Sequence, residues 1–211
     1  MLFTPTGDEL PELFAHVERV EAMTHRQAIR PPNKPLSFWI EEFNALPNNR
    51  QRWCTRSIKI QPCINFLKAN PDSTLMVGLR ADEEERTGLY GDFATYRYPL
   101  REWGWGLDEV MDYLARRGVR VPKRTDCAVC YAQRIGEWWN LWREHPDRWA
   151  RGEAWESKTG HTFRSAKRDS WPASMAGMRA EFEKGLVPRT VPLPQLFDQE
   201  EETQPCRVCR F

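Results

Sequence analysis

The sequence predicts an α/β fold with a parallel sheet, followed by a tryptophan-rich helical part and an extended tail. Helix and strand patterns alternate along the first part of the chain, which is typical of a parallel α/β sheet. Most of the ten tryptophans fall after position 100, so we expect the later helices to pack through aromatic rings. We therefore assign residues 1–150 to an α/β core and residues 151–211 to a C-terminal helical extension with a proline-rich, acidic tail.

The elements of the expected core follow in order. A short strand at the start of the chain leads into a turn at Gly7, and Pro11 suits the first turn of a helix that runs to about Met23. After a proline-rich loop, apolar residues at helical spacing predict further helices and one clear strand. We expect helices over residues 38–46, 54–67, 107–117 and 132–144, and a strand over 74–78.

The end of that strand is the first candidate for a binding site. In an open α/β sheet, ligands bind outside the carboxyl ends of the strands. Gly78 lets a ligand approach the backbone closely, and the guanidinium of Arg80 suits a phosphate or a sulfate. The pattern therefore favours an anionic nucleotide, and the alternative is a solvated, charged turn.

The six cysteines favour metal binding in a reducing compartment over a disulfide framework. Cys127 and Cys130 form one C-x-x-C pair, and Cys206 and Cys209 form another near the end of the tail. Four thiolates would make a structural zinc site. The alternatives are free thiols or an exposed redox pair in the tail. Cys63 lies on the opposite helical face from Cys54, so we expect it to be a small buried hydrophobic residue.

Five blocks of the sequence resemble the phosphoadenosine phosphosulfate (PAPS) reductase family of the PP-loop, N-type ATP pyrophosphatase superfamily. They cover roughly residues 3–135 and occur in the family's order. The blocks are TPTGDELPE, WCTRSIKIQP with Cys54, Lys59 and Pro62, the segment from Gly78 to Arg86, the segment from Tyr98 to Leu114, and DCAVC.

The resemblance implies an adenine-nucleotide alpha-hydrolase-like, Rossmann-like fold. It also implies reduction of a sulfonucleotide, or ATP-dependent adenylation linked to sulfur transfer. The nucleotide, ATP or a PAPS-like molecule, would contact residues from three blocks. These are Thr6 and Gly7, which shape the crevice, Lys59, which adds charge, and Gly78, Arg80, Asp82 and Arg86, which hold or orient the anion.

The same resemblance makes Cys54 a further metal ligand. Cluster-bearing relatives carry a cysteine at the matching position, so Cys54, Cys127, Cys130 and one tail cysteine would hold a four-iron cluster. A zinc ion bound by Cys127, Cys130, Cys206 and Cys209 is the alternative cofactor.

One departure from the family concerns its phosphate-binding SGGxDS loop, which precedes the TG segment in relatives. The first βα unit is missing before Thr6 and Gly7, so we expect weak nucleotide binding or a partner protein that supplies the loop. A non-catalytic or subunit-dependent metal-binding accessory protein is therefore the alternative function.

Composition excludes several other classes of protein. The formal net charge of +1 gives no basic footprint for nucleic acid. No apolar run is long enough to span a membrane, and the start lacks the pattern of a signal peptide. These features predict a cytoplasmic protein.

Overall fold

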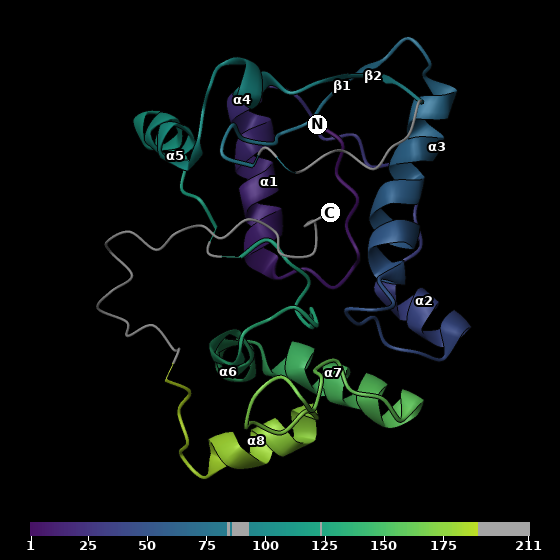
Figure 1. Cartoon of the computed structure of the whole chain (residues 1–211), viewed down its shortest axis with the longest axis vertical. Helices are drawn as coiled ribbons and strands as arrows, with labels where there is room; N and C mark the ends of the chain where they lie inside the picture. The colour runs from purple at the N-terminus through teal and green to yellow at the C-terminus, as the bar shows by residue number, and fades with distance from the viewer. Residues whose placement is uncertain (84, 86–92, 123, 190–211) are drawn as a thin grey trace.

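The computed structural model describes residues 1–83, 85, 93–122 and 124–189 of the chain (Figure 1). This part is mixed α/β, with mostly helical elements. In chain order they are α1 (Pro11–Thr24), α2 (Leu36–Phe43), the π-helix η1 (Thr55–Ile60), α3 (Gln61–Ala69), β1 (Thr74–Met76), β2 (Thr95–Arg97), α4 (Pro99–Glu102), α5 (Leu107–Arg116), α6 (Ile135–Glu144), α7 (Pro146–Thr159) and α8 (Met175–Glu183).

The sheet is parallel, as expected, but it is much smaller than a Rossmann-like sheet. β1 pairs with β2 in the register Thr74 to Thr95 through Met76 to Arg97. Within the described residues, the only other parallel pairing is an isolated bridge between Leu2 and Ile29. Pro5 follows Leu2 and Pro31 follows Ile29, and a proline has no N–H to donate to a sheet ladder. The pairing therefore stops after one bridge.

The expected helices are present, with shifted ends. α1 begins at Pro11, and α5 ends just before Gly118, whose φ of +64° is the left-handed conformation that suits glycine. The helix predicted after Cys54 is divided into η1 and α3. The sequence analysis predicted a helical C-terminal extension but gave no bounds for α7 and α8.

The C-terminal part is helical and packs through its aromatic residues, which confirms that prediction. Trp138 is fully buried, and Trp149, Trp155 and Phe163 are at least nine-tenths buried. The rings meet edge to face or tilted, for example Trp138 against Trp149 with centroids 6.2 Å apart. The largest hydrophobic core joins residues from α2 and η1 to this part of the chain. Helix α7 runs through position 150 without a break.

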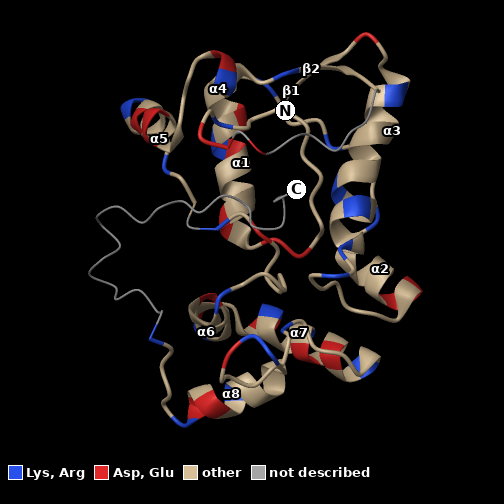
Figure 2. Ribbon diagram, in the orientation of Figure 1, with Lys and Arg blue, Asp and Glu red and all other residues tan. Residues whose placement is uncertain are grey.

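The elements lie toward two ends of the molecule. The helices α6, α7 and α8 gather at one end, and β1, β2 and α4 lie at the other, with α1 between them (Figure 1). Acidic and basic residues are interspersed along the helices in this view (Figure 2). None of the described helices combines the length and the apolar character needed to cross a bilayer.

Candidate functional site

The turn at Thr6 and Gly7 is held by the carboxylate of Glu9. The Thr6 N–H donates to Glu9 Oε1 over 2.6 Å, the Thr6 hydroxyl donates to the same oxygen over 2.7 Å, and the Gly7 N–H donates to Oε2 over 2.9 Å. Gly7 has a φ of +77°, and a Cβ at this position would lie 3.1 Å from the Cβ of Pro35. A side chain at position 7 would therefore be strained.

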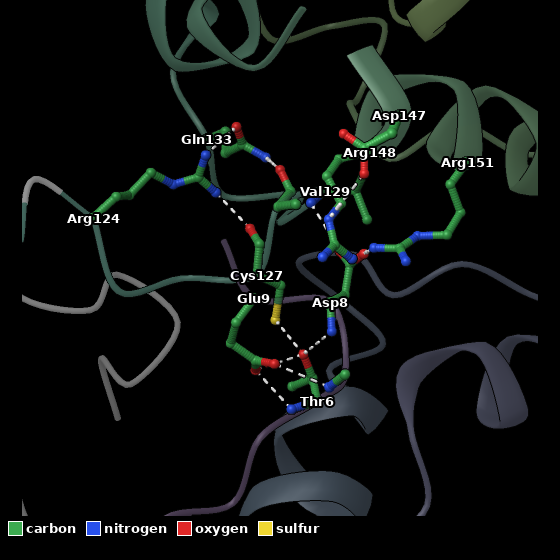
Figure 3. A network of polar contacts seen from close by, with 12 residues as sticks. Thr6, Asp8, Glu9, Arg124, Cys127, Val129, Gln133, Asp147, Arg148 and Arg151 are labelled. Atoms are coloured by element: carbon green, nitrogen blue, oxygen red, sulfur yellow. Dashed lines mark hydrogen bonds and ion pairs between the residues drawn. The ribbon is translucent and has the colours of Figure 1, made fainter. Parts of the chain in front are cut away.

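This turn contacts the first C-x-x-C pair (Figure 3). Glu9 and Cys127 form an antiparallel bridge, and the Thr6 Oγ1 lies 3.2 Å from the Cys127 Sγ. Burial raises the pKa of the Cys127 thiol to about 12, against the opposing charge of Lys59. Burial also raises the pKa of Cys130. Both thiols therefore keep their protons at neutral pH unless a metal ion replaces them.

Cys54 joins the same neighbourhood from a different segment. It stands at the start of η1, whose hydrogen bonds run from residue i to residue i+5. Lys59 lies five positions further on, within η1. Burial raises the pKa of Cys54, and the charge of Lys59 opposes the shift. Because Lys59 acts on Cys127 as well, it lies near both thiols.

Tyr131 also belongs to this region. Burial raises the pKa of its phenol to about 12, and the charges of Cys54 and Cys130 raise it further. The charge of Lys59 acts on both Cys54 and Cys127, and Cys54 and Cys130 both act on Tyr131, so these electrostatic contacts place the five residues in one region of the structure. We call these five residues the cysteine centre.

As donors, three thiols fit a soft metal such as iron in a cluster or zinc. Within the described ranges, however, no group of three or more His, Cys, Asp or Glu side chains is arranged to hold a metal ion. The expected fourth ligand, Cys206 or Cys209, lies outside those ranges. Cys63 is 8% exposed, in agreement with a buried structural thiol.

The residues at the end of β1 interact with one another. Arg80 donates from Nε and Nη2 to the two carboxylate oxygens of Asp82, over 2.8 and 3.2 Å. This pairing lowers the pKa of Asp82, which also accepts the N–H of Leu107 at the start of α5. Arg101 of α4 donates to the Arg80 carbonyl over 3.3 Å. Gly78 is exposed beside this cluster, and Arg86 lies outside the described residues.

The structure therefore divides the expected nucleotide residues into two groups. Thr6, Gly7 and Lys59 lie with the cysteine centre, whereas Gly78, Arg80 and Asp82 lie beside α4. Since α4 and α7 lie toward opposite ends of α1, the two groups are well apart (Figure 1).

Sequence reasoning missed the residues that support the turn from Cys127 to Cys130. They are Asp8, Glu9, Arg124, Gln133 and Arg151 (Figure 3). The acidic pair directly after Thr6 and Gly7 was the one available signal for Asp8 and Glu9. No local pattern marks the arginines, because their contacts depend on the tertiary fold.

In comparisons with known proteins, no family model matches the chain, and no curated protein or solved structure matches it either. The relation to PAPS reductases therefore rests on the sequence blocks, and the functions that it implies are proposals.

Proposed function

We propose that this chain is a PAPS reductase-like protein that acts on an adenine sulfonucleotide or on ATP and carries a cysteine-ligated metal centre. One observation supports this most strongly. Three blocks of the resemblance are far apart in the sequence, yet Thr6 Oγ1 lies 3.2 Å from Cys127 Sγ, and the charge of Lys59 acts on both Cys54 and Cys127.

Cys54, Cys127 and Cys130 would hold a four-iron cluster together with one tail cysteine. When bound, the cluster would place a polarising, thiolate-ligated centre beside the turn at Thr6 and Gly7. Lys59 would offer its ammonium group to the anionic part of the nucleotide, since it lies among these thiols. The chemistry would be reduction of the sulfonucleotide, or adenylation linked to sulfur transfer.

Metal and sulfide analysis of anaerobically purified full-length protein tests this proposal. We expect iron with acid-labile sulfide, and loss of both in Cys127→Ser and in Cys54→Ser. Cys63→Ser is the matched control and should keep its metal, because this buried thiol serves packing. Stoichiometric zinc that persists in Cys54→Ser would contradict the cluster and indicate the site formed by the two C-x-x-C pairs.

A metal-binding accessory protein is the second candidate, and the Arg80–Asp82 contact favours it. An arginine that already gives two hydrogen bonds to a carboxylate has less to offer a phosphate. Turnover of PAPS or ATP by the metal-loaded chain alone would exclude this candidate. Turnover only after a second protein is added would support it.

A further inference from the structure

We propose that Asp8 is a positioning residue for the cysteine centre and that Arg151 of α7 holds it in place. The C-terminal helices would thereby set the geometry of the turn that carries Cys127 and Cys130. The inference rests on the proposed function in one respect, namely that these thiols bind a metal.

Asp8 contacts the turn through both its backbone and its side chain. Its carbonyl accepts the Ala128 N–H over 2.6 Å, and its Oδ2 accepts the Val129 N–H over 3.1 Å. The other carboxylate oxygen pairs with Arg151 (Figure 3). Asp8 is 1% exposed. The two residues between the cysteines are thus tied by their amides to one buried residue, Ala128 to its backbone carbonyl and Val129 to its carboxylate.

The carbonyl side of the same turn is held independently. Gln133 Nε2 donates to the Ala128 carbonyl over 2.6 Å, and Arg124 donates to the Cys127 carbonyl. Arg124 also donates to Gln133 Oε1 over 2.8 Å, which fixes the amide of that side chain. With its amides and its carbonyls both bound, the turn has little freedom, so the fold sets the Cα–Cβ directions of Cys127 and Cys130.

A purely structural role explains this arrangement less well. Burial raises the pKa of Asp8 despite the nearby charge of Arg151, so the carboxylate loses hydration that the pair only partly replaces. Buried ion pairs are often no more stabilising than apolar residues of similar volume. A costly carboxylate that accepts the Val129 N–H of a ligand-bearing turn and is itself paired with Arg151 fits a positioning role, by analogy with the second shell of metal sites.

The first test uses metal-free, full-length protein and the alkylation of individual cysteines by iodoacetamide, followed by mass spectrometry. We expect Asp8→Ala to speed alkylation of Cys127 by about tenfold or more, because the hydrogen bond from the Val129 N–H to the charged carboxylate, which keeps the turn closed, is lost. Asp8→Asn removes the same negative charge, which raises the Cys127 pKa, but keeps an acceptor for Val129, so its effect should be smaller. Arg151→Ala should act in the same direction. Cys63 in the same molecules is the internal reference, and its rate should not change.

Arg179→Ala is the matched control. It removes the contact of 2.8 Å between Arg179 and Glu153, which joins α8 to α7 away from the turn. This variant should leave Cys127 as protected as in the wild-type protein. If Asp8→Ala exposes Cys63 and Cys127 in equal proportion, Asp8 is a general stability residue and the inference is wrong.

The second test adds cobalt(II) to the metal-free protein, because its absorption spectrum reports thiolate ligation. We expect Asp8→Ala to change the spectrum and weaken uptake, and Asp8→Asn, which keeps an oxygen for the Val129 amide, to recover part of the wild-type behaviour. Identical spectra and uptake in all three proteins would overturn the inference. If the wild-type chain takes up no metal, the proposed function fails, while the alkylation rates still decide the role of Asp8.

Discussion

Glu156 is a buried carboxylate in α7, and among the residues that the structure describes no cation pairs with it. Its Oε1 accepts the Phe163 N–H over 3.0 Å and its Oε2 accepts the Met175 N–H over 2.6 Å. Burial raises its pKa to about 7, although the two amides oppose the shift. The folded protein therefore binds this proton more tightly than the unfolded chain does. The resulting stability is fully present below the ordinary pKa of a glutamate and is lost as the pH rises through about 7.

We expect Glu156→Gln to remove this dependence on pH. The quantity to compare is the difference in free energy of unfolding between wild type and variant, from urea titrations at about pH 5 and about pH 8. The wild-type advantage should be larger at the lower pH. Glu181→Gln, which alters a surface pair with Lys184, is the control and should show little change. A wild-type advantage that grows with pH would mean that the two amides outweigh burial.

At the scale of single residues, the sequence predicted the candidate ligands and binding residues better than the residues that hold them in place. Cys54, Cys127 and Thr6 could be proposed because a thiol or a TG turn is informative in its own segment. Asp8 and Arg151 could not be paired in advance, since 143 positions separate them and only the fold brings them together. Arg80 shows a second limit of sequence-based prediction. A guanidinium that suits a phosphate suits the carboxylate of Asp82 equally well, so the residue type alone does not tell which anion it binds.

Among the elements, α7 packs most closely against its neighbours, and Gly152 is the reason. A Cβ at this position would lie 2.5 Å from the Met175 Sδ and 2.8 Å from Val129 Cγ1. We expect Gly152→Ala to destabilise the protein by about 1–3 kcal/mol through overpacking, even though alanine is the better helix former. Thermal and urea denaturation measure the loss.

Ser157→Ala serves as the control for that substitution. Ser157 lies in the same helix but is exposed, so alanine there should leave stability unchanged or raise it slightly. If Gly152→Ala is as stable as wild type, α7 and α8 can move apart to admit the extra methyl group without a loss in the free energy of unfolding. The contact between the cysteine turn and α7 would then be looser than the distances indicate.

Helical elements were easier to predict than strands for a physical reason. The 3.6-residue pattern of α1 and α5 is local, and proline or glycine marks their ends. The sequence predicted β1, as a strand over 74–78, but not β2, because a strand of three residues is too short for an alternating pattern and its pairing with β1 crosses a long connection. The change from π to α hydrogen bonding at Gln61 leaves no trace in the apolar pattern. The charged, glycine-containing sequence of α7 hides its buried face.

Across the whole molecule, the two groups of anion-binding candidates, one at the cysteine centre and one after β1, lie toward opposite ends of α1 (Figure 1). This helix has 14 residues, so it is about 21 Å long. Lys59, with the cysteine centre, lies toward the α7 end, whereas Arg80 contacts α4 at the other. The phosphate or sulfate of one nucleotide can contact one group or the other directly. Binding measurements on variants can therefore show which group holds the anion.

We expect the nucleotide to bind at the cysteine centre. Calorimetric titration of full-length, metal-loaded protein with ATP and with PAPS should show that Lys59→Ala weakens binding by about tenfold or more, because a hydrogen bond between charged groups is lost. Arg80→Ala should leave the affinity nearly unchanged and only loosen the start of α5, where Asp82 accepts the Leu107 N–H. The reverse result would place the anion at the end of β1. The thiols would then lie too far from the nucleotide to act on it directly, which would favour a structural role for the metal.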